Sequence, residues 1–350
     1  MTAPGRRAGR VTLRWRGWSL RFRIRSVLVL LASVAAIAAA AVIGLLLGDL
    51  DLSFAEVLRA LTGRSSDPLA TYFVTEVRLP RVVTALVVGA ALGIAGAVFQ
   101  NLTGNPLGSP DVIGFTTGAA TGALVLIIVV GGGPTAVAFG ALLGGLGTAA
   151  LVWLLTRRTG LTGQRLVLVG LGVGVGLAAL NTLLVARASL VAAQTAAQWL
   201  AGSLNAVLWP RTGWTAVAVL LLVVPLCWLS RPLSMLPLGE DVAIASGVPV
   251  QRLRTALVLL AVGLVSVATA ATGPIGFVAL AAPQVSRRLI GVPSPGPIGS
   301  GITGALLVLV SDLLAQHLFS PTELAVGVVT GTLGGAYLVA LLALEWRKSR

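Results

Sequence analysis

Long runs of apolar residues dominate this chain and leave it few ways to fold. The first run, residues 26–48, has 23 consecutive residues without a charged side chain, and about 20 such residues suffice for a helix to cross a bilayer. Only 10% of the 350 residues are charged, whereas a soluble domain has about a quarter. We therefore expect an all-α, polytopic membrane protein. Ten membrane-spanning helices are predicted, at residues 26–48, 79–100, 111–131, 134–156, 165–187, 211–229, 254–272, 275–290, 299–319 and 324–345.

The basic residues are distributed unevenly between the loops. Eight arginines lie within residues 1–25, ahead of a first run that is longer than the ~7–15-residue core of a signal peptide. With both termini in the cytoplasm, nineteen of the 25 Lys and Arg residues fall on the cytoplasmic side, as the positive-inside rule requires. We interpret residues 1–25 as a cytoplasmic arm and 26–350 as one transmembrane domain. The net charge of +14 thus reflects topology and contact with anionic lipid rather than nucleic-acid binding.

Three residue types that carry much of protein chemistry occur once each. The chain has one cysteine, Cys227, one histidine, His317, and one lysine, Lys348. These counts exclude a cysteine metal cluster and a multi-histidine metal site, so no metal ligands are predicted. A P-loop needs a lysine directly after its glycines. Any ATP that drives this protein must therefore be hydrolysed by another protein.

Two stretches interrupt the apolar pattern with glycine and proline. Residues 101–122 read NLTGNPLGSPDVIGFTTGAATG, and residues 271–288 read ATGPIGFVALAAPQVSRR. Backbone without helical hydrogen bonds cannot face lipid, so we expect both stretches to lie within protein or beside water. Paired interruptions in the two halves of a transporter point to its translocation pathway and indicate two inverted-repeat halves. The alternative for residues 101–122 is a rigid loop with a helix cap.

Three longer motifs resemble the signatures of a known family. They read RLPRVVTALVVGAALGIAGAVFQNLTGNPLGSPDVIGFTTGAATGA at 78–123, TGPIGFVALAAPQVSRRLIG at 272–291 and SPTELAVGVVTGTLGGAYL at 320–338. They resemble the FecCD-type permeases, which belong to bacterial ABC importers for iron siderophores and vitamin B12. The resemblance extends over nearly the whole chain after the basic arm. AAQWLAGSLN at 196–205 is most similar to the ferric enterobactin permeases.

The resemblance implies a multi-subunit importer in the bacterial cytoplasmic membrane. Its other parts would be a homologous permease subunit that completes a dimer, expected to be a heterodimer, two cytoplasmic ATPase subunits, and an extracytoplasmic substrate-binding protein. ATP would bind to the ATPase subunits, and no cofactor would bind to this chain. The substrate would be a ferric siderophore, expected to be a catecholate like enterobactin. A hydroxamate siderophore, haem and vitamin B12 are the alternative substrates.

The resemblance also implies where the pathway closes. In the family, the NPL turn closes its cytoplasmic end, so Asn105, Pro106 and Leu107 become gate candidates. The turn at residues 159–164 would form a second cytoplasmic constriction, with Thr162 and Gly163 as its candidates.

Two arginines mark the outer start of the second predicted helix. Arg78 and Arg81 lie one turn apart in RLPR, and we expect both to point outward, where arginines suit carboxylates on a partner. The resemblance implies that they meet acidic residues of the substrate-binding protein. A third arginine of the family would fall near residue 316, where this chain has Gln316. The alternative is that the two arginines only snorkel to the membrane surface.

One long cytoplasmic loop, residues 233–254, has the pattern of two short helices. Glu240 and Asp241 suit a helix start, Gly247 a stop and Pro249 a second start. The loop resembles the family's coupling helices, which contact the ATPase subunits; a hairpin lying on the bilayer is the alternative. The coupling candidates are Gly239, Glu240, Asp241, Ala243, Gly247 and Val248.

Gln100 and Asp312 are among the polar residues that fall inside predicted membrane spans. An intramembrane carboxylate is a candidate for function, so a proton-coupled secondary transporter is an alternative function. Asp312 has no second titratable group predicted beside it, and we favour a hydrogen bond between packed helices for both residues. An intramembrane enzyme would need several converging catalytic groups, which the chain lacks, so we predict no enzymatic activity for it.

Overall fold

The computed structural model describes most of the chain. The described residues are 10–15, 18–48, 50–157, 163–233, 235–236, 239–292, 294, 296–319 and 322–348.

Ten helical segments of the described chain correspond to the ten predicted spans. Seven are long and apolar enough to cross a membrane: α1 (Ile24–Leu46), α4 (Leu79–Thr103), α6 (Pro134–Thr156), α7 (Gly163–Ala186), α9 (Trp209–Trp228), α12 (Val250–Thr272) and α14 (Pro297–His317). The other three are α5 (Phe115–Leu124) with its continuation η2 (Val125–Val130), α13 (Val278–Ile290) and α15 (Val326–Lys348). The chain is thus an all-α, multi-pass membrane protein. The arrangement in two inverted-repeat halves stays a prediction.

Shorter elements cover the ends of the long helices. The helices are α2 (Phe54–Leu61), α3 (Pro68–Tyr72) with η1 (Phe73–Arg78), α8 (Leu190–Leu200), α10 (Ser230–Leu233) and α11 (Glu240–Ala245). Two antiparallel strands, β1 (Arg10–Trp15) and β2 (Trp18–Arg23), pair with Val11 opposite Phe22. This hairpin lies within the predicted arm, for which the sequence indicated no regular structure.

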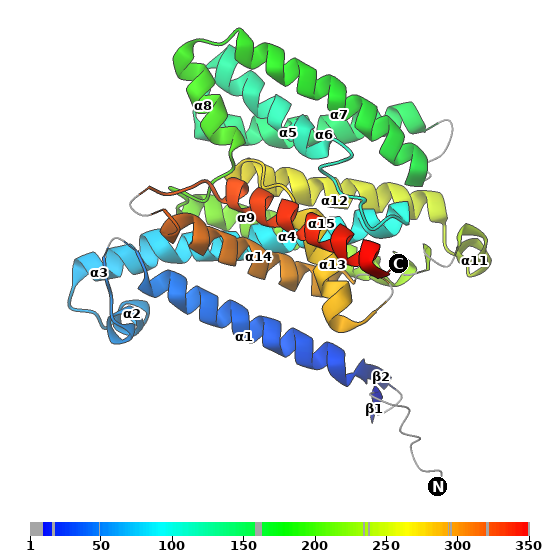
Figure 1. Cartoon of the computed structure of the whole chain (residues 1–350), viewed down its shortest axis with the longest axis horizontal. Helices are drawn as coiled ribbons and strands as arrows, with labels where there is room; N and C mark the ends of the chain where they lie inside the picture. The colour runs from blue at the N-terminus through cyan, green and yellow to red at the C-terminus, as the bar shows by residue number, and fades with distance from the viewer. Residues whose placement is uncertain are drawn as a thin grey trace.

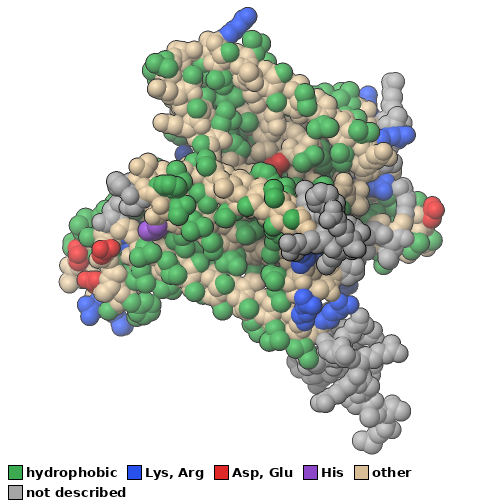
Figure 2. Space-filling model, in the orientation of Figure 1, with side chains coloured by type: hydrophobic (Ala, Val, Ile, Leu, Met, Phe, Trp, Pro, Cys, Tyr) green, Lys and Arg blue, Asp and Glu red, His purple; other side chains and the backbone are tan. Residues whose placement is uncertain are grey.

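The long helices run roughly along one common direction (Figure 1). The start of α1, the end of α15 and α11 lie at one end of the molecule, and α2, α3 and α8 lie at the other. We call these the α11 end and the α3 end. Apolar side chains cover the middle of the face in Figure 2, and most charged ones gather towards the two ends. This is the surface that a membrane-spanning protein needs, because hydrocarbon solvates charge poorly.

The core is built around α4 and α12, which are the most deeply buried of the long apolar helices. α4 packs closely against α14 because small residues face each other across the contact. A side chain at Gly89 would overlap the carbonyl oxygen of Gly304, and one at Gly93 would overlap that of Ser300. Glycine at such positions lets two backbones approach closely, as in other membrane helix pairs.

Candidate functional site

The first interrupted stretch begins with a tight turn at the end of α4. Gly104 ends the helix in the left-handed conformation, with φ +63°. The Asn105 side-chain oxygen then accepts a hydrogen bond from the Leu107 N–H at 2.9 Å, and the Gly108 N–H donates to the Asn105 carbonyl at 2.9 Å. An asparagine that bonds to the backbone two residues later stabilises such a turn. The NPL turn is therefore held by its own local bonds.

From this turn the chain passes back into the molecule along α7. At the start of α7, Gly163 lies against α4, with its missing Cβ only 2.7 Å from the Thr103 Cα atom. Further along, a Cβ at Gly174 would lie 2.9 Å from the Gly114 Cα atom. With a rise of 1.5 Å per residue, Gly174 is about 16 Å further along α7 than Gly163. Residues 104–114 thus extend deep into the molecule without forming a helix, and we call them the re-entrant segment.

The depth of this segment differs from the sequence-based expectation. The sequence predicted a span that starts at Asp111, whereas α5 begins at Phe115, after the left-handed Gly114. The physical reason is that Gly114 and Gly174 let the two backbones touch, which brings the irregular chain against protein instead of lipid. Non-helical backbone at this depth is tolerated where protein surrounds it.

The second interrupted stretch holds the first in place. The Gln284 side-chain amide of α13 donates to the Pro106 carbonyl at 2.8 Å. The Asp111 carboxylate accepts hydrogen bonds from the Phe277 backbone N–H and from the Thr116 hydroxyl. Phe277 itself adopts the left-handed conformation, with φ +68°. The structure therefore brings residues 101–114 and 273–284 together, although they are far apart in the sequence.

The gate candidates lie at the start of the re-entrant segment. Asn105, Pro106 and Leu107 are exposed, and 51% of the Leu107 surface is accessible. Gly163 contacts the end of α4, so the two predicted constrictions are neighbours, while Thr162 lies outside the described residues. Gln100, on α4, donates its side-chain amide to the Leu280 carbonyl at 3.0 Å, in line with a packing role. The gate itself stays a prediction for this chain.

Arg78 points inward, not outward as the sequence suggested. It is buried, and its guanidinium donates to the carbonyls of Leu45 at 2.8 Å, Leu46 at 3.1 Å and Leu50 at 2.6 Å. The last carbonyls of a helix have no partner within that helix, and Arg78 supplies one at the end of α1. The Arg78 guanidinium thus forms hydrogen bonds within this chain and does not point to a partner protein.

Arg81 also turns to partners within the chain. It binds the Asp312 carboxylate through two nitrogens, at 3.0 Å each, and Glu323 at 3.3 Å. The Gln316 amide donates to the same Asp312 carboxylate at 2.8 Å. The sequence left Asp312 without a charged partner. Matching the depths would have found one, because Arg81 and Asp312 both lie near the α3 ends of their antiparallel helices.

Within its described residues, the coupling loop contains one short helix, α11, and not two. α11 ends at the left-handed Gly247, with φ +80°, and the Val248 N–H donates to the Ala243 carbonyl at 3.0 Å. Ala243 is fully buried. The second helix predicted after Pro249 is instead the first turn of α12, because no residue after Val250 stops it. α11 projects from the molecule (Figure 1) and exposes the apolar residues Val242 and Ile244 together with Asp241.

Comparison with known proteins decides the family. A model of the FecCD transport family matches residues 23–344. The chain belongs to this family. FecCD membership confirms the resemblance found in the motifs, and it identifies the chain as a transport protein and not as an enzyme.

Individual relatives of this FecCD protein cover almost the whole chain. The ferric enterobactin transport system permease protein FepG of Escherichia coli (strain K12) is 46% identical over 93% of this chain and 98% of its own length. The achromobactin transport system permease protein CbrC of Dickeya dadantii (strain 3937) is 38% identical over 84% and 85%. A solved inward-facing structure of a metal-chelate type ABC transporter superposes with a TM-score of 0.81, at 31% identity over 90% of this chain and 98% of that one.

Proposed function

We propose that this FecCD protein is the membrane-spanning permease subunit of an ATP-driven importer for ferric chelates. The observation that carries the proposal is the re-entrant segment 104–114, held by Gln284 and lying beside the start of α7, in a chain whose relatives include FepG over 93% of its length. Irregular backbone within a transporter lines its pathway. We assign the gate to Asn105, Pro106 and Leu107, with Gly163 and Thr162 beside them.

The proposed substrate is a ferric siderophore of the catecholate class, like enterobactin. The 46% identity to FepG supports it, and it exceeds the 36% identity to the vitamin B12 import system permease protein BtuC of Serratia proteamaculans (strain 568). Relatives named for achromobactin, iron(3+)-hydroxamate and Fe(3+)-citrate make those chelates the alternative substrates.

The remaining subunits are assigned to the two ends of the molecule. The ATPase subunits would bind at the α11 end, around Val242 and Ile244, since exposed apolar residues on a projecting helix suit a groove on a partner. The substrate-binding protein would dock at the α3 end. There Arg81 and Gln316 both bind Asp312, so we assign them to shaping this surface, with Arg78 holding α1 against it. A homologous permease subunit would complete the dimer.

The substrate can be tested by complementation in Escherichia coli lacking FepG. The chain is expressed with its own associated subunits, and uptake of radioactive iron is measured separately from ferric enterobactin, a ferric hydroxamate and ferric citrate. We expect uptake above that of the same strain without the chain from ferric enterobactin alone. Uptake from another chelate instead would refute the catecholate assignment and leave the importer assignment standing. Uptake that persists after mutation of the ATPase catalytic glutamate would refute the ATP-driven importer.

A further inference from the structure

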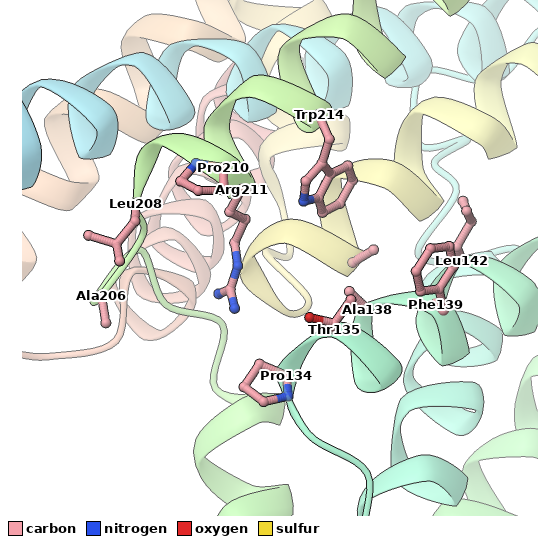
Figure 3. Close-up of a pocket in the computed structure, with 11 residues that line it drawn as sticks. Pro134, Thr135, Ala138, Phe139, Leu142, Ala206, Leu208, Pro210, Arg211 and Trp214 are labelled. Atoms are coloured by element: carbon pink, nitrogen blue, oxygen red, sulfur yellow. The ribbon is translucent and has the colours of Figure 1, made fainter.

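A hollow opens between α6 and α9 near the α3 end, away from the re-entrant segment. Its volume is about 590 Å³, which is within the range of small-molecule sites. Nine of its eleven lining residues are apolar, and the exceptions are Thr135 and Arg211. Phe139, Leu142 and Trp214 form much of its wall, and Figure 3 shows Arg211 extending from α9 into the space towards α6.

A second hollow of about 350 Å³, with more polar residues in its lining, adjoins the first. The two share Pro134, Arg211 and Ala270. The second adds side chains that form hydrogen bonds, among them Gln198, Ser203 and Asn205. Arg211 therefore lies at the boundary between an apolar space and a more polar one.

The charge of Arg211 is not neutralised within the part of the chain that the structure describes. Its side chain is half-buried, and among the described residues its guanidinium has no hydrogen-bond acceptor or carboxylate partner. No Asp or Glu lines either hollow. A guanidinium that is partly removed from water without a partner costs free energy, and an anion bound beside it would remove that cost.

The position of Arg211 matches the level at which lipid headgroups meet acyl chains. It lies in the first turn of α9, next to Trp209, whose ring N–H donates to the Thr75 carbonyl at 2.7 Å. Tryptophan is enriched at the membrane interface. From this level, Phe139 and Leu142 continue the apolar wall along α6 in the direction away from the α3 end.

We propose that these two hollows together bind one anionic phospholipid. Its phosphate would lie against the Arg211 guanidinium, which suits phosphate as a bidentate donor. Its polar headgroup would occupy the space near Gln198 and Asn205, and one acyl chain would lie along Phe139 and Trp214. A ferric chelate is the other anion that this protein would meet, but the wall of the larger hollow offers almost no hydrogen-bond partner to a polar ligand.

The test measures binding of phosphatidylglycerol to the full-length chain, purified in non-ionic detergent with the subunits that accompany it. After delipidation, the protein is titrated with phosphatidylglycerol, and bound lipid is counted by native mass spectrometry. We expect one tightly held lipid, and roughly tenfold weaker binding in Arg211→Gln, because a charge-assisted hydrogen bond is lost. Arg211→Lys should keep most of the affinity. Ala138→Phe, which fills the apolar space, should weaken binding with the charge intact.

Arg187→Gln is the matched control, because Arg187 is an exposed arginine beyond α7 that lines neither hollow. Lipid binding unchanged in Arg211→Gln, or reduced as much in Arg187→Gln, would refute the site. Displacement of the lipid by ferric enterobactin in the wild type and not in Arg211→Gln would assign the hollow to the substrate. Neither the amount of bound lipid nor its displacement by ferric enterobactin depends on transport. The lipid site can therefore fail this test while the proposed importer function stands.

Discussion

At the scale of single residues, the ion pair between Arg81 and Asp312 links α4 to α14. Both side chains are largely removed from water, with 14% and 2% of their surfaces exposed. The sequence places Asp312 inside a membrane span, but local patterns do not pair it with Arg81, which is 231 positions away. Only a comparison of the depths of the two residues in their helices would have done so. Arg78 shows the same limit, since its carbonyl partners Leu45, Leu46 and Leu50 belong to the end of α1 and the segment after it.

Removing one member of this pair should be more harmful than removing both. We expect Arg81→Met to lower the stability by about 3–5 kcal/mol, because the Asp312 carboxylate is left buried without a partner. The double variant Arg81→Met with Asp312→Leu should recover most of this loss. The measurement is the unfolding temperature in detergent.

Glu323→Gln is the control for this comparison. Glu323 also contacts Arg81 but is 38% exposed, and an exposed ion pair contributes at most about 1 kcal/mol. If Glu323→Gln lowers the unfolding temperature as much as Arg81→Met does, the stability does not come mainly from the buried ion pair between Arg81 and Asp312.

At the scale of elements, the Gln284 side chain of α13 forms a hydrogen bond to residues 105–107, the proposed gate turn. The sequence identified both interrupted stretches, because glycine and proline stand out against apolar runs. It could not show that Gln284 bonds to Pro106, or that the glycines of α7 admit the re-entrant segment, since both depend on how distant helices pack. The sequence also could not show that the second short helix predicted in the coupling loop is the first turn of α12, which leaves α11 as the one short helix described there.

Loss of the Gln284 bond should loosen the gate turn. Gln284→Leu leaves the Pro106 carbonyl unpaired, and a net hydrogen bond contributes about 1 kcal/mol, which is roughly a fivefold change in population. We expect iron uptake per ATP hydrolysed to fall about fivefold in proteoliposomes. Thr182→Val is the control, because this exposed hydroxyl bonds only within its own helix, to Ala178. Equal iron uptake per ATP hydrolysed in Gln284→Leu and Thr182→Val would exclude a role for Gln284 in holding the proposed gate turn.

Exposed apolar residues of α11 should hold the ATPase subunits. Charging that face with Val242→Asp and Ile244→Asp should abolish co-purification of the ATPase, because a buried, unpaired carboxylate costs several kcal/mol. The permease itself should remain folded, since both side chains are exposed in it. The control is Leu190→Asp with Val191→Asp, which charges two exposed apolar residues of α8 at the α3 end and should co-purify normally. Normal co-purification of the doubly charged variant would place the ATPase elsewhere.

At the scale of the whole molecule, hydropathy predicted all ten spans to within a few residues at most boundaries. The match follows from physics, since each span must bury its backbone polar groups in a helix and present apolar side chains to lipid. The non-helical stretches after α4 and α12 are the places where hydropathy does not predict the structure. There the neighbouring helices, and not the local sequence, decide how deep the irregular chain lies.

The orientation of the whole molecule can be tested by labelling single cysteines. The sequence predicts that nineteen of the 25 Lys and Arg residues face the cytoplasm, because basic loops stay inside, and we expect the cytoplasmic side to be the α11 end. In a Cys227→Ala background, Ser65→Cys replaces a half-buried serine in the otherwise exposed loop before α3, and Ser246→Cys lies at the exposed end of α11. A membrane-impermeant maleimide added to intact spheroplasts should label residue 65 alone, and both residues once the cells are broken. Labelling of residue 246 alone in intact spheroplasts would invert the topology, and with it the ends assigned to the ATPase and the substrate-binding protein.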